Sequence, residues 1–268
     1  DVPNRVLEDE IDLSLLRNTS VNLPEVTEPQ VVRHYINLSV KNHHVDRDFY
    51  PLGSCTMKYN PKINDAMAAL PGFSGIHPNQ PEKSVQGALH ILYKLEKMLC
   101  KITGMNAVTL QPNAGSQGEL LGILLMKKYH SLKRNKKKYI LIPDTAHGTN
   151  FASIVLGGYE TCTLKSDGRG RVDLDDLKEK VDENVAGMML TQPNTLGLFE
   201  DQIEEITNAI HKVDGLMYMD GANLNALVGL CKPADMGFDI VHINLHKTFS
   251  TPHGGGGPGA GPIAVTTK

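Results

Sequence analysis

The sequence lacks several features that would define a membrane, secreted or metal-binding protein. No stretch approaches the roughly 18 consecutive apolar residues of a transmembrane helix. The 268 residues include no tryptophan and only four cysteines, Cys55, Cys100, Cys162 and Cys231, which form no CxxC pair. This usage is typical of a reducing compartment and excludes a zinc or redox motif of that kind. We therefore expect a cytoplasmic protein with no membrane partner and no metal site.

The chain also lacks an excess of charge of either sign. Lysine and arginine number 27 and aspartate and glutamate 30, for a formal charge of −3. Such a balance argues against a general nucleic-acid binder and a membrane-surface protein. The charge run at 133–138 stands between a predicted helix and a predicted strand, contains no aromatic residue and belongs to no wider basic face, so we interpret it as a solvated turn. The N-terminal segment DVPNRVLEDEID is acidic and polar, unlike a signal peptide.

Residues 1–80 and 81–268 differ in pattern, and we predict an N-terminal arm followed by one large domain. Repeated prolines interrupt the arm, with short helices predicted over 28–42 and 60–70. Such an arm is either an oligomer contact or a wrapped terminus. From residue 81, apolar residues recur every three or four positions up to Ile102, and Gly104 follows. This predicts an amphipathic helix that ends at a glycine.

The large domain alternates apolar strands with helical patterns. Alternation of this kind predicts an α/β fold with a mostly parallel sheet and flanking helices. Ligands of such sheets bind beyond the carboxyl ends of the strands. The predicted strands are 107–110, 139–142, 160–164, 185–190, 216–219 and 240–244. The predicted helices among them are 119–129, 149–156, 174–181 and 202–213.

The first of four motifs, NAGSQGE at 113–119, has the form of a phosphate cradle. It has two glycines and a Ser116–Glu119 pair with the spacing of a capping box. A helix N-terminus offers unpaired backbone N–H groups and the positive end of the helix dipole to an anion. The alternative is a tight strand-to-helix turn, because the segment matches neither common nucleotide-binding glycine motif.

The second and third motifs carry a histidine and an aspartate after predicted strands. In DTAHGTN (144–150), His147 could stack on a flat ligand, act as an acid or base, or cap the next helix. In YMDGAN (218–223), Asp220 ends an apolar strand and precedes two small residues. This placement suits either a structural turn or a carboxylate aimed at a cationic ring nitrogen.

The fourth motif is Lys247, which ends DIVHINLHK (239–247) and precedes a glycine-rich segment. Six of the eight residues at 254–261 are glycine, in a chain whose 25 glycines already exceed the usual ~7%. A lysine that ends an apolar strand is not a typical solvated lysine, and in a dry site it could form a Schiff base. Clustered glycine indicates close backbone approach or a tight reversal.

In this order, the four motifs resemble the pyridoxal-phosphate enzymes of the aspartate-aminotransferase fold type, fold type I. Longer strings are similar to a particular family, the glycine decarboxylase P-protein of the glycine cleavage system, and to the second subunit of its two-subunit form. These strings are LPEVTEPQVVRHY (23–35), FYPLGSCTMKYNPK (49–62), NLHKTF (244–249) and PHGGGGPG (252–259). The resemblance extends over nearly the whole chain.

The resemblance implies pyridoxal phosphate as the cofactor and glycine as the substrate. Glycine would lose its carboxylate as carbon dioxide, and the aminomethyl group would pass to the oxidised lipoyl arm of H-protein. The first P-protein subunit would be a further partner, in a hetero-oligomer or a dimer of heterodimers. In this assignment Lys247 carries the cofactor, His147 stacks on its ring, and Asp220 keeps the ring nitrogen protonated.

The resemblance implies further contacts as well. Ala222 would touch the other face of the ring, Asn194 would bond the ring hydroxyl, and His246 would assist the phosphate. The phosphate would lie on Ala114, Gly115, Ser116 and Gln117. A polar segment that could line the glycine pocket contains Ser54, Cys55, Thr56, Lys58, Tyr59 and Asn60.

The chain stops at Lys268, whereas the resemblance implies a small C-terminal domain beyond the lysine that helps to close the site. We therefore expect a large domain with its arm and without that small domain. Two alternatives to a glycine decarboxylase are left open. One is another fold-type-I decarboxylase or lyase, against which the string PLGSCTMKYNP argues. The other is a catalytically incompetent fragment with an assembly role.

Overall fold

A computed structural model of the chain describes residues 11–43, 45–48, 59–251 and 259–267. The chain separates into two compact units, Asp1–Phe49 and Tyr50–Lys268, and each is described by itself. The functional division into an arm over 1–80 and a cofactor domain over 81–268 stays a prediction.

The described part of the first unit contains a 3-10 turn, η2 (Leu13–Leu15), and a longer helix, α1 (Glu28–Ser39). The helix begins within the predicted range because Thr27 and Gln30 form a capping box. The backbone N–H and the hydroxyl of Thr27 donate to Gln30 Oε1, at 2.8 and 2.9 Å. No residue of α1 is buried, so its apolar side chains add nothing to a core.

The second unit is built on a sheet whose described strands follow the order β1-β7-β6-β5-β4-β2-β3. Neighbours from β3 to β6 run parallel, and β7 runs antiparallel to both β1 and β6. Six strands lie where they are predicted, whereas the three-residue strand β7 is not predicted. The bounds are β1 (Ala107–Thr109), β2 (Tyr139–Pro143), β3 (Glu160–Leu164), β4 (Val185–Thr191), β5 (Leu216–Gly221), β6 (Ile240–Ile243) and β7 (Ile263–Val265).

The helices of this unit confirm the predicted periodicity. Gly104 stops the long helix α4 in a left-handed conformation, φ 76°, and its N–H donates to the Cys100 carbonyl at 2.8 Å. The helices before β1 are α2 (Lys62–Ala68), α3 (Pro71–Ser74), η3 (Glu82–Ser84) and α4 (Gln86–Thr103). The later ones are α5 (Gly115–Leu132), α6 (Gly148–Leu156), α7 (Leu174–Lys180), α8 (Ile203–Lys212), η4 (Pro233–Met236) and α9 (Leu245–Thr248).

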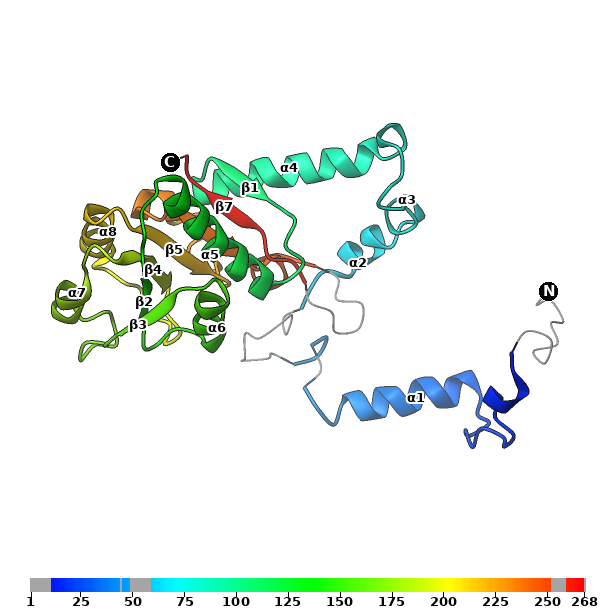
Figure 1. Cartoon of the computed structure of the whole chain (residues 1–268). Coiled ribbons are helices and arrows are strands. Elements are labelled where there is room, and N and C mark those ends of the chain that lie inside the picture. The colour runs from blue at the N-terminus through cyan, green and yellow to red at the C-terminus, as the bar shows by residue number, and fades with distance from the viewer. Residues whose placement is uncertain (1–10, 44, 49–58, 252–258, 268) are drawn as a thin grey trace. The chain divides into compact units, whose positions relative to one another are not determined.

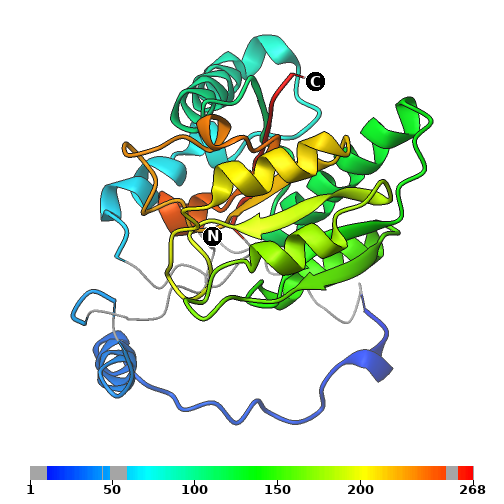
Figure 2. The same cartoon turned by 90° about the vertical axis from the view of Figure 1, so that its left-hand side faces the viewer.

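Helices pack on both faces of the sheet, so the strands are buried on both sides. Helices α5 and α6 cover one face (Figure 1), where their side chains pack with Ala186, Met189 and Tyr218. Helices α4, α7 and α8 cover the opposite face (Figure 2), where their side chains belong to one core cluster with Met217 and Met219. The alternation of Met217, Tyr218 and Met219 between faces follows from the two-residue period of a strand. This double cover explains why the strands are continuous apolar runs.

The strand order creates a switch point between β2 and β4. The helix that follows β2 is α6, on one face, and the helix that follows β4 is α8, on the other. In open α/β sheets, ligands bind outside the carboxyl ends of the strands at such a point. The segments after β2, β4, β5 and β6 are therefore the place to look for a site.

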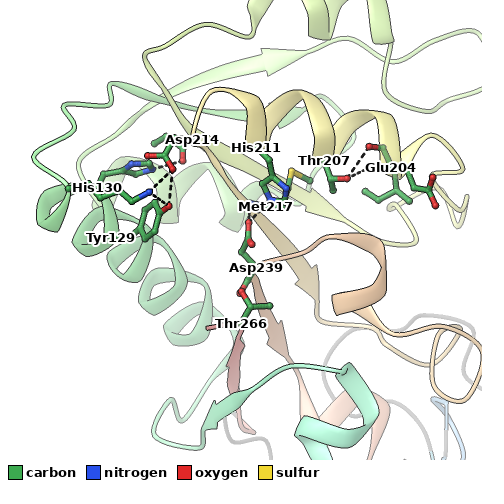
Figure 3. A network of polar contacts seen from close by, with 12 residues as sticks. Tyr129, His130, Glu204, Thr207, His211, Asp214, Met217, Asp239 and Thr266 are labelled. Atoms are coloured by element: carbon green, nitrogen blue, oxygen red, sulfur yellow. Dashed lines mark hydrogen bonds and ion pairs between the residues drawn. The ribbon is translucent and has the colours of Figure 1, made fainter. Parts of the chain in front are cut away.

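The amino-terminal edge of the same sheet is closed by hydrogen bonds that aspartate side chains accept (Figure 3). Asp239, just before β6, accepts the Met217 N–H at 2.8 Å and lies 2.8 Å from His211 Nε2. Asp214, just before β5, accepts from the Tyr129 hydroxyl at 2.9 Å and from Lys133 Nζ at 2.7 Å. Lys133 belongs to the predicted solvated turn, which lies between α5 and β2. Its bond to Asp214 connects that turn to the start of β5.

Among the described residues, no helix combines the length and the apolar character needed to cross a membrane. Cys100, Cys162 and Cys231 are free thiols, and Cys55 lies outside the described residues.

Candidate active site at the carboxyl edge of the sheet

Asp220 lies near the carboxyl end of β5 and is buried, with 4% of its surface exposed. Its Oδ1 accepts the Ala222 N–H at 2.9 Å, which is a turn contact and fits the structural alternative. Its Oδ2 accepts a hydrogen bond from Asn150 Nδ2 at 3.1 Å, and His242 Nδ1 lies 3.5 Å from Oδ1. These partners come from the turn after β5, from α6 and from β6, so three parts of the chain orient this carboxylate.

His242 extends this buried polar group beneath Asp220. It is fully buried in β6, and its Nδ1 lies 2.8 Å from the Tyr218 hydroxyl. Burial of Tyr218 raises its pKa well above the ordinary value, so this side chain is a neutral phenol. The polar contacts of Asp220 therefore continue into the core of the sheet rather than out to solvent.

His147 occupies the N-cap position of α6. Its Nδ1 accepts the Thr149 N–H at 3.3 Å and lies 2.7 Å from Thr149 Oγ1. Helix capping, one of the three predicted roles, is therefore confirmed. The side chain of His147 is exposed at the same time, so the cap leaves part of the ring available to a ligand.

The predicted capping box of Ser116 and Glu119 is wrong. α5 begins at Gly115, its N-cap is Ala114, and no side chain caps it. Glu119 is instead buried, 6% exposed, and contacts two hydroxyls of α6, Thr149 Oγ1 at 2.9 Å and Ser153 Oγ at 3.2 Å. The burial raises the pKa of the Glu119 carboxyl. Packing against α6 has overridden the local pattern.

The N-terminus of α5 has the form of an anion site. Because no side chain caps it, the backbone N–H groups of its first turn face outward from the helix end. A Cβ at Gly115 would overlap Asn244 Oδ1, and a Cβ at Gly261 would overlap the Ala114 carbonyl oxygen. The end of the glycine-rich run thus passes against this helix start, which confirms the predicted close approach for Gly259–Gly261; residues 252–258 lie outside the described residues.

Lys247 lies in the one-turn helix α9 and not at the end of a strand, because β6 ends at Ile243. Its neighbours connect it to the same edge of the sheet. Thr248 Oγ1 accepts the Leu224 N–H at 3.1 Å, which joins α9 to the loop after Asp220. His246 is buried, and its Nδ1 accepts the Ala260 N–H at 3.3 Å.

Asn194 is held by contacts within its own region of the chain, and the predicted glycine-pocket segment is described only in part. Asn194 Nδ2 donates to the Gly170 carbonyl at 2.8 Å, and its Oδ1 accepts two N–H groups of its own loop. Its bond to a ring hydroxyl stays a prediction. Asn60 Oδ1 accepts from the Ser250 hydroxyl at 3.2 Å, near α9, and Tyr59 is exposed. The other predicted pocket residues, Ser54, Cys55, Thr56 and Lys58, lie outside the described residues.

Buried polar atoms without a hydrogen-bond partner gather at this edge. Each such atom costs about 1–3 kcal/mol, so a cluster of them is typical of a place that receives a polar ligand. Thr191, for example, ends β4 opposite Asp220. Over the described part of the chain the set at this edge is Asn150 Oδ1, Thr191 Oγ1, His242 Nε2 and Asn244 Oδ1, and His130 Nδ1 is a further such atom at the amino-terminal edge. The described part of the chain contains no group of three or more His, Cys, Asp or Glu side chains that could hold a metal ion.

The family model described as "Glycine cleavage system P-protein" matches residues 2–268. The chain belongs to this P-protein family. It is 58% identical over all 268 of its residues to a protein of Chloroherpeton thalassium named "Probable glycine dehydrogenase (decarboxylating) subunit 2", of which the match covers 54%. The chain spans about half the length of the curated relatives it matches. The predicted resemblance is confirmed.

Solved structures confirm the predicted fold class of this P-protein chain. It is similar to a glycine decarboxylase P-protein in inhibitor-bound form, with a TM-score of 0.72, 25% identity, and 97% of this chain and 57% of that one covered. It is also similar to a sphingosine-1-phosphate lyase from Burkholderia pseudomallei, with a TM-score of 0.66, 15% identity, and coverage of 92% and 61%. The second likeness concerns the fold alone.

Sequence reasoning overlooked several polar residues of this edge in the P-protein chain. Asn150 and Asn244 stand inside quoted motifs, but nothing in their spacing assigns them a partner. His242 carried a signal, since a histidine inside the apolar strand Ile240–Ile243 must be buried and therefore needs a polar neighbour. Glu119 gave a misleading signal, because its spacing from Ser116 pointed to a local contact.

Proposed function

We propose that this P-protein chain binds pyridoxal phosphate at the carboxyl edge of its sheet and acts as a glycine dehydrogenase (decarboxylating). The supporting observation is the convergence, in a chain of this family, of a buried and oriented Asp220, the uncapped start of α5 and the α9 lysine, Lys247. The aspartate, the helix start and the lysine come from distant parts of the sequence, yet all three lie on segments that leave the same edge of the sheet. A structural turn at any one of them does not account for this arrangement.

The residues present fit the cofactor. The phosphate would bind the backbone N–H groups at the start of α5, which Ala114, Gly115, Ser116 and Gln117 form. His246 would assist it; its ring accepts the N–H of Ala260, next to Gly261, which packs against this helix start. The ring would lie between His147 and Ala222, with Asn194 at its hydroxyl. Lys247 would hold the cofactor covalently, because an amine in a partly buried site can add to an aldehyde.

When bound, pyridoxal phosphate supplies a conjugated ring that takes up the electron pair left as glycine's carboxylate departs as carbon dioxide. Asp220 holds a proton at the ring nitrogen, since a carboxylate close to that nitrogen favours its charged form. Asn150 and the Ala222 N–H keep the carboxylate in place. The negative charge that develops in the transition state is therefore stabilised by a group that needs no rearrangement.

The partners follow from the same proposal. The aminomethyl group passes to one sulfur of the oxidised lipoyl disulfide of H-protein, and the other sulfur leaves as a thiol, so the disulfide is the oxidant. The relatives named "subunit 2" support a first P-protein subunit as the assembly partner. The cysteine usage favours a cytoplasmic location.

The test is reconstitution of the chain with pyridoxal phosphate, the first subunit and lipoylated H-protein. We expect exchange of the glycine carboxyl group with labelled bicarbonate, and after borohydride reduction we expect the cofactor on the peptide that contains Lys247. Cofactor on a different lysine would contradict the site. Cofactor on Lys247 without exchange would contradict glycine as the substrate and favour another decarboxylase or an assembly role.

A further inference from the structure

Asn244 lies where α9, the helix that contains Lys247, meets the start of α5. It is the N-cap residue of α9, and its carbonyl accepts the Lys247 N–H at 3.0 Å and the Thr248 N–H at 3.1 Å. An asparagine at an N-cap ordinarily turns its side-chain oxygen onto the helix that it caps. Asn244 makes no such side-chain bond, so α9 uses its backbone carbonyl and leaves its amide free for another partner.

The side-chain amide of Asn244 lies against the first residue of α5. A Cβ at Gly115 would overlap both Oδ1 and Nδ2 of Asn244, so the amide reaches this helix only because Gly115 has no side chain. Asn244 is buried, with 6% of its surface exposed, and its Oδ1 has no hydrogen-bond partner. Natural folds seldom leave a buried amide in this condition, and its place at a helix start indicates a ligand that completes it.

The start of α5 determines the charge of that ligand. No side chain caps this 18-residue helix, so the N–H groups of its first turn and the positive end of its dipole favour an anion. An anion bound there lies beside Asn244, whose amide offers two more N–H donors. Since Oδ1 has no partner, turning the amide to present Nδ2 to the anion breaks no hydrogen bond of the oxygen.

We propose that Asn244 is a positioning residue that donates from its side-chain amide to the anion at the start of α5 and thereby fixes the helix that carries Lys247. The anion is the phosphate group of the cofactor, so this inference rests on the proposed function. One residue then connects the phosphate to the carbonyl that accepts the Lys247 N–H. Binding of the phosphate therefore orders the lysine. A merely structural Asn244 would stabilise the start of α9 without responding to an anion.

The first experiment measures the phosphate preference of the whole chain, defined as the dissociation constant of pyridoxine divided by that of pyridoxine 5'-phosphate. The two probes differ only by the phosphate, and neither has an aldehyde that could react with Lys247. A variant that is partly unfolded loses affinity for both probes alike, so the quotient isolates the phosphate contact. We expect Asn244→Ala to lower the preference at least about tenfold, because it removes a hydrogen bond to a charged group.

A charge at the same position should have a larger effect. Asn244→Asp keeps the size of the side chain but places a carboxylate beside the anion, so it should lower the preference further than Asn244→Ala. Asn208→Asp adds the same charge at an exposed position of α8 and should keep the wild-type preference. An unchanged preference in Asn244→Ala would overturn this proposal alone. A wild-type chain without any preference would overturn the phosphate site of the proposed function, and this proposal with it.

The second experiment asks whether the anion fixes α9. Backbone hydrogen exchange of the whole chain is followed in inorganic phosphate and in chloride at equal ionic strength, and neither ion reacts with Lys247. Phosphate should slow exchange in the segment 245–249 of the wild type and of Asn208→Asp, but not of Asn244→Ala. Equal slowing in wild type and Asn244→Ala would overturn the positioning role. So would a wild type that prefers the phosphate but shows no slowing in this segment.

Discussion

Two aspartates of the same sheet, Asp220 at the carboxyl edge and Asp239 at the amino edge, are about equally buried, with 4% and 5% exposed. Asp239 accepts the Met217 N–H and pairs with His211, so its bonds hold β5, β6 and α8 together (Figure 3). Asp220 also accepts two hydrogen bonds, from the Ala222 N–H and Asn150 Nδ2, but the atoms around it include a His242 nitrogen and an Asn150 oxygen without partners. Equal burial therefore serves two different purposes.

The two edges differ in how many buried polar atoms lack a hydrogen-bond partner. At the amino edge, buried charge is paired and lysines such as Lys133 close the loops. At the carboxyl edge, four buried polar atoms of the described residues are left unpaired, against one, His130 Nδ1, at the amino edge, and each costs about 1–3 kcal/mol. Natural folds keep such groups at sites where a ligand completes them. The four predictions below test this contrast, from the largest expected effect to the smallest.

The largest effect should come from removing the lysine of the carboxyl edge. Lys247→Ala should lose all cofactor that borohydride can attach to the chain, because no amine is left to form the bond. The measurement is cofactor absorbance on the protein after reduction and gel filtration. Lys133→Ala, at the amino edge, is the control and should retain full labelling. Wild-type labelling in Lys247→Ala would assign the anchor to another lysine.

Loss of charge should affect turnover at Asp220 and the free energy of unfolding at Asp239. Asp220→Asn should lower turnover per bound cofactor at least about tenfold, which is about 1.4 kcal/mol in the barrier, with a modest change in apparent glycine affinity. Asp239→Asn should lower the free energy of unfolding by about 1–3 kcal/mol and leave turnover per folded site unchanged. Urea unfolding and turnover measured on both variants decide the point. Near-normal turnover in Asp220→Asn would make it a turn residue only.

A methyl group should distinguish the two helix starts at the carboxyl edge. Gly115→Ala places a Cβ against Asn244 Oδ1 and should weaken cofactor binding several-fold. Gly148→Ala, at the start of α6, meets nothing within 4 Å, so it should bind cofactor normally. Cofactor titration by fluorescence would measure both. Equal affinities would show that the start of α5 is not the phosphate site.

The smallest effect concerns the pH dependence of stability. Because burial raises the folded-state pKa of Glu119 above the ordinary 4.5, the folded chain binds this proton more tightly than the unfolded chain. This contribution is fully present below pH 4.5 and is lost as pH rises through the folded-state pKa. The free energy of unfolding of Glu119→Gln relative to wild type should therefore increase with pH above about 4.5. Urea midpoints across this range check the sign, and a decrease would contradict it.

Much of the fold followed from local patterns. The strand at 160–164 and the end of α4 at Gly104 lie where the sequence predicts them, since apolar periodicity and a glycine stop are read within one element. The strand Ile263–Val265 could not be predicted in this way. Its three residues form a strand only because β1 and β6 pair with it from both sides.

The candidate site divides in the same way. The motifs that carry His147, Asp220 and Lys247 were visible as polar residues at the ends of apolar runs. Their partners were not, because Asn150 and Asp220 are 70 positions apart and meet only when α6 packs beside β5. Glu119 and Thr149 are likewise 30 positions apart.

The sequence alone determined the family, the alternation of strands and helices, and the chemical groups available at the strand ends, because each is written in neighbouring residues. Tertiary structure alone decided which of those groups touch. It turned Glu119 from a helix cap into a buried acid, moved Lys247 from a strand end into a one-turn helix, and set His242 beneath Asp220. Packing prevailed at these positions because the free energy of burying a polar side chain depends on partners that come from distant segments of the chain.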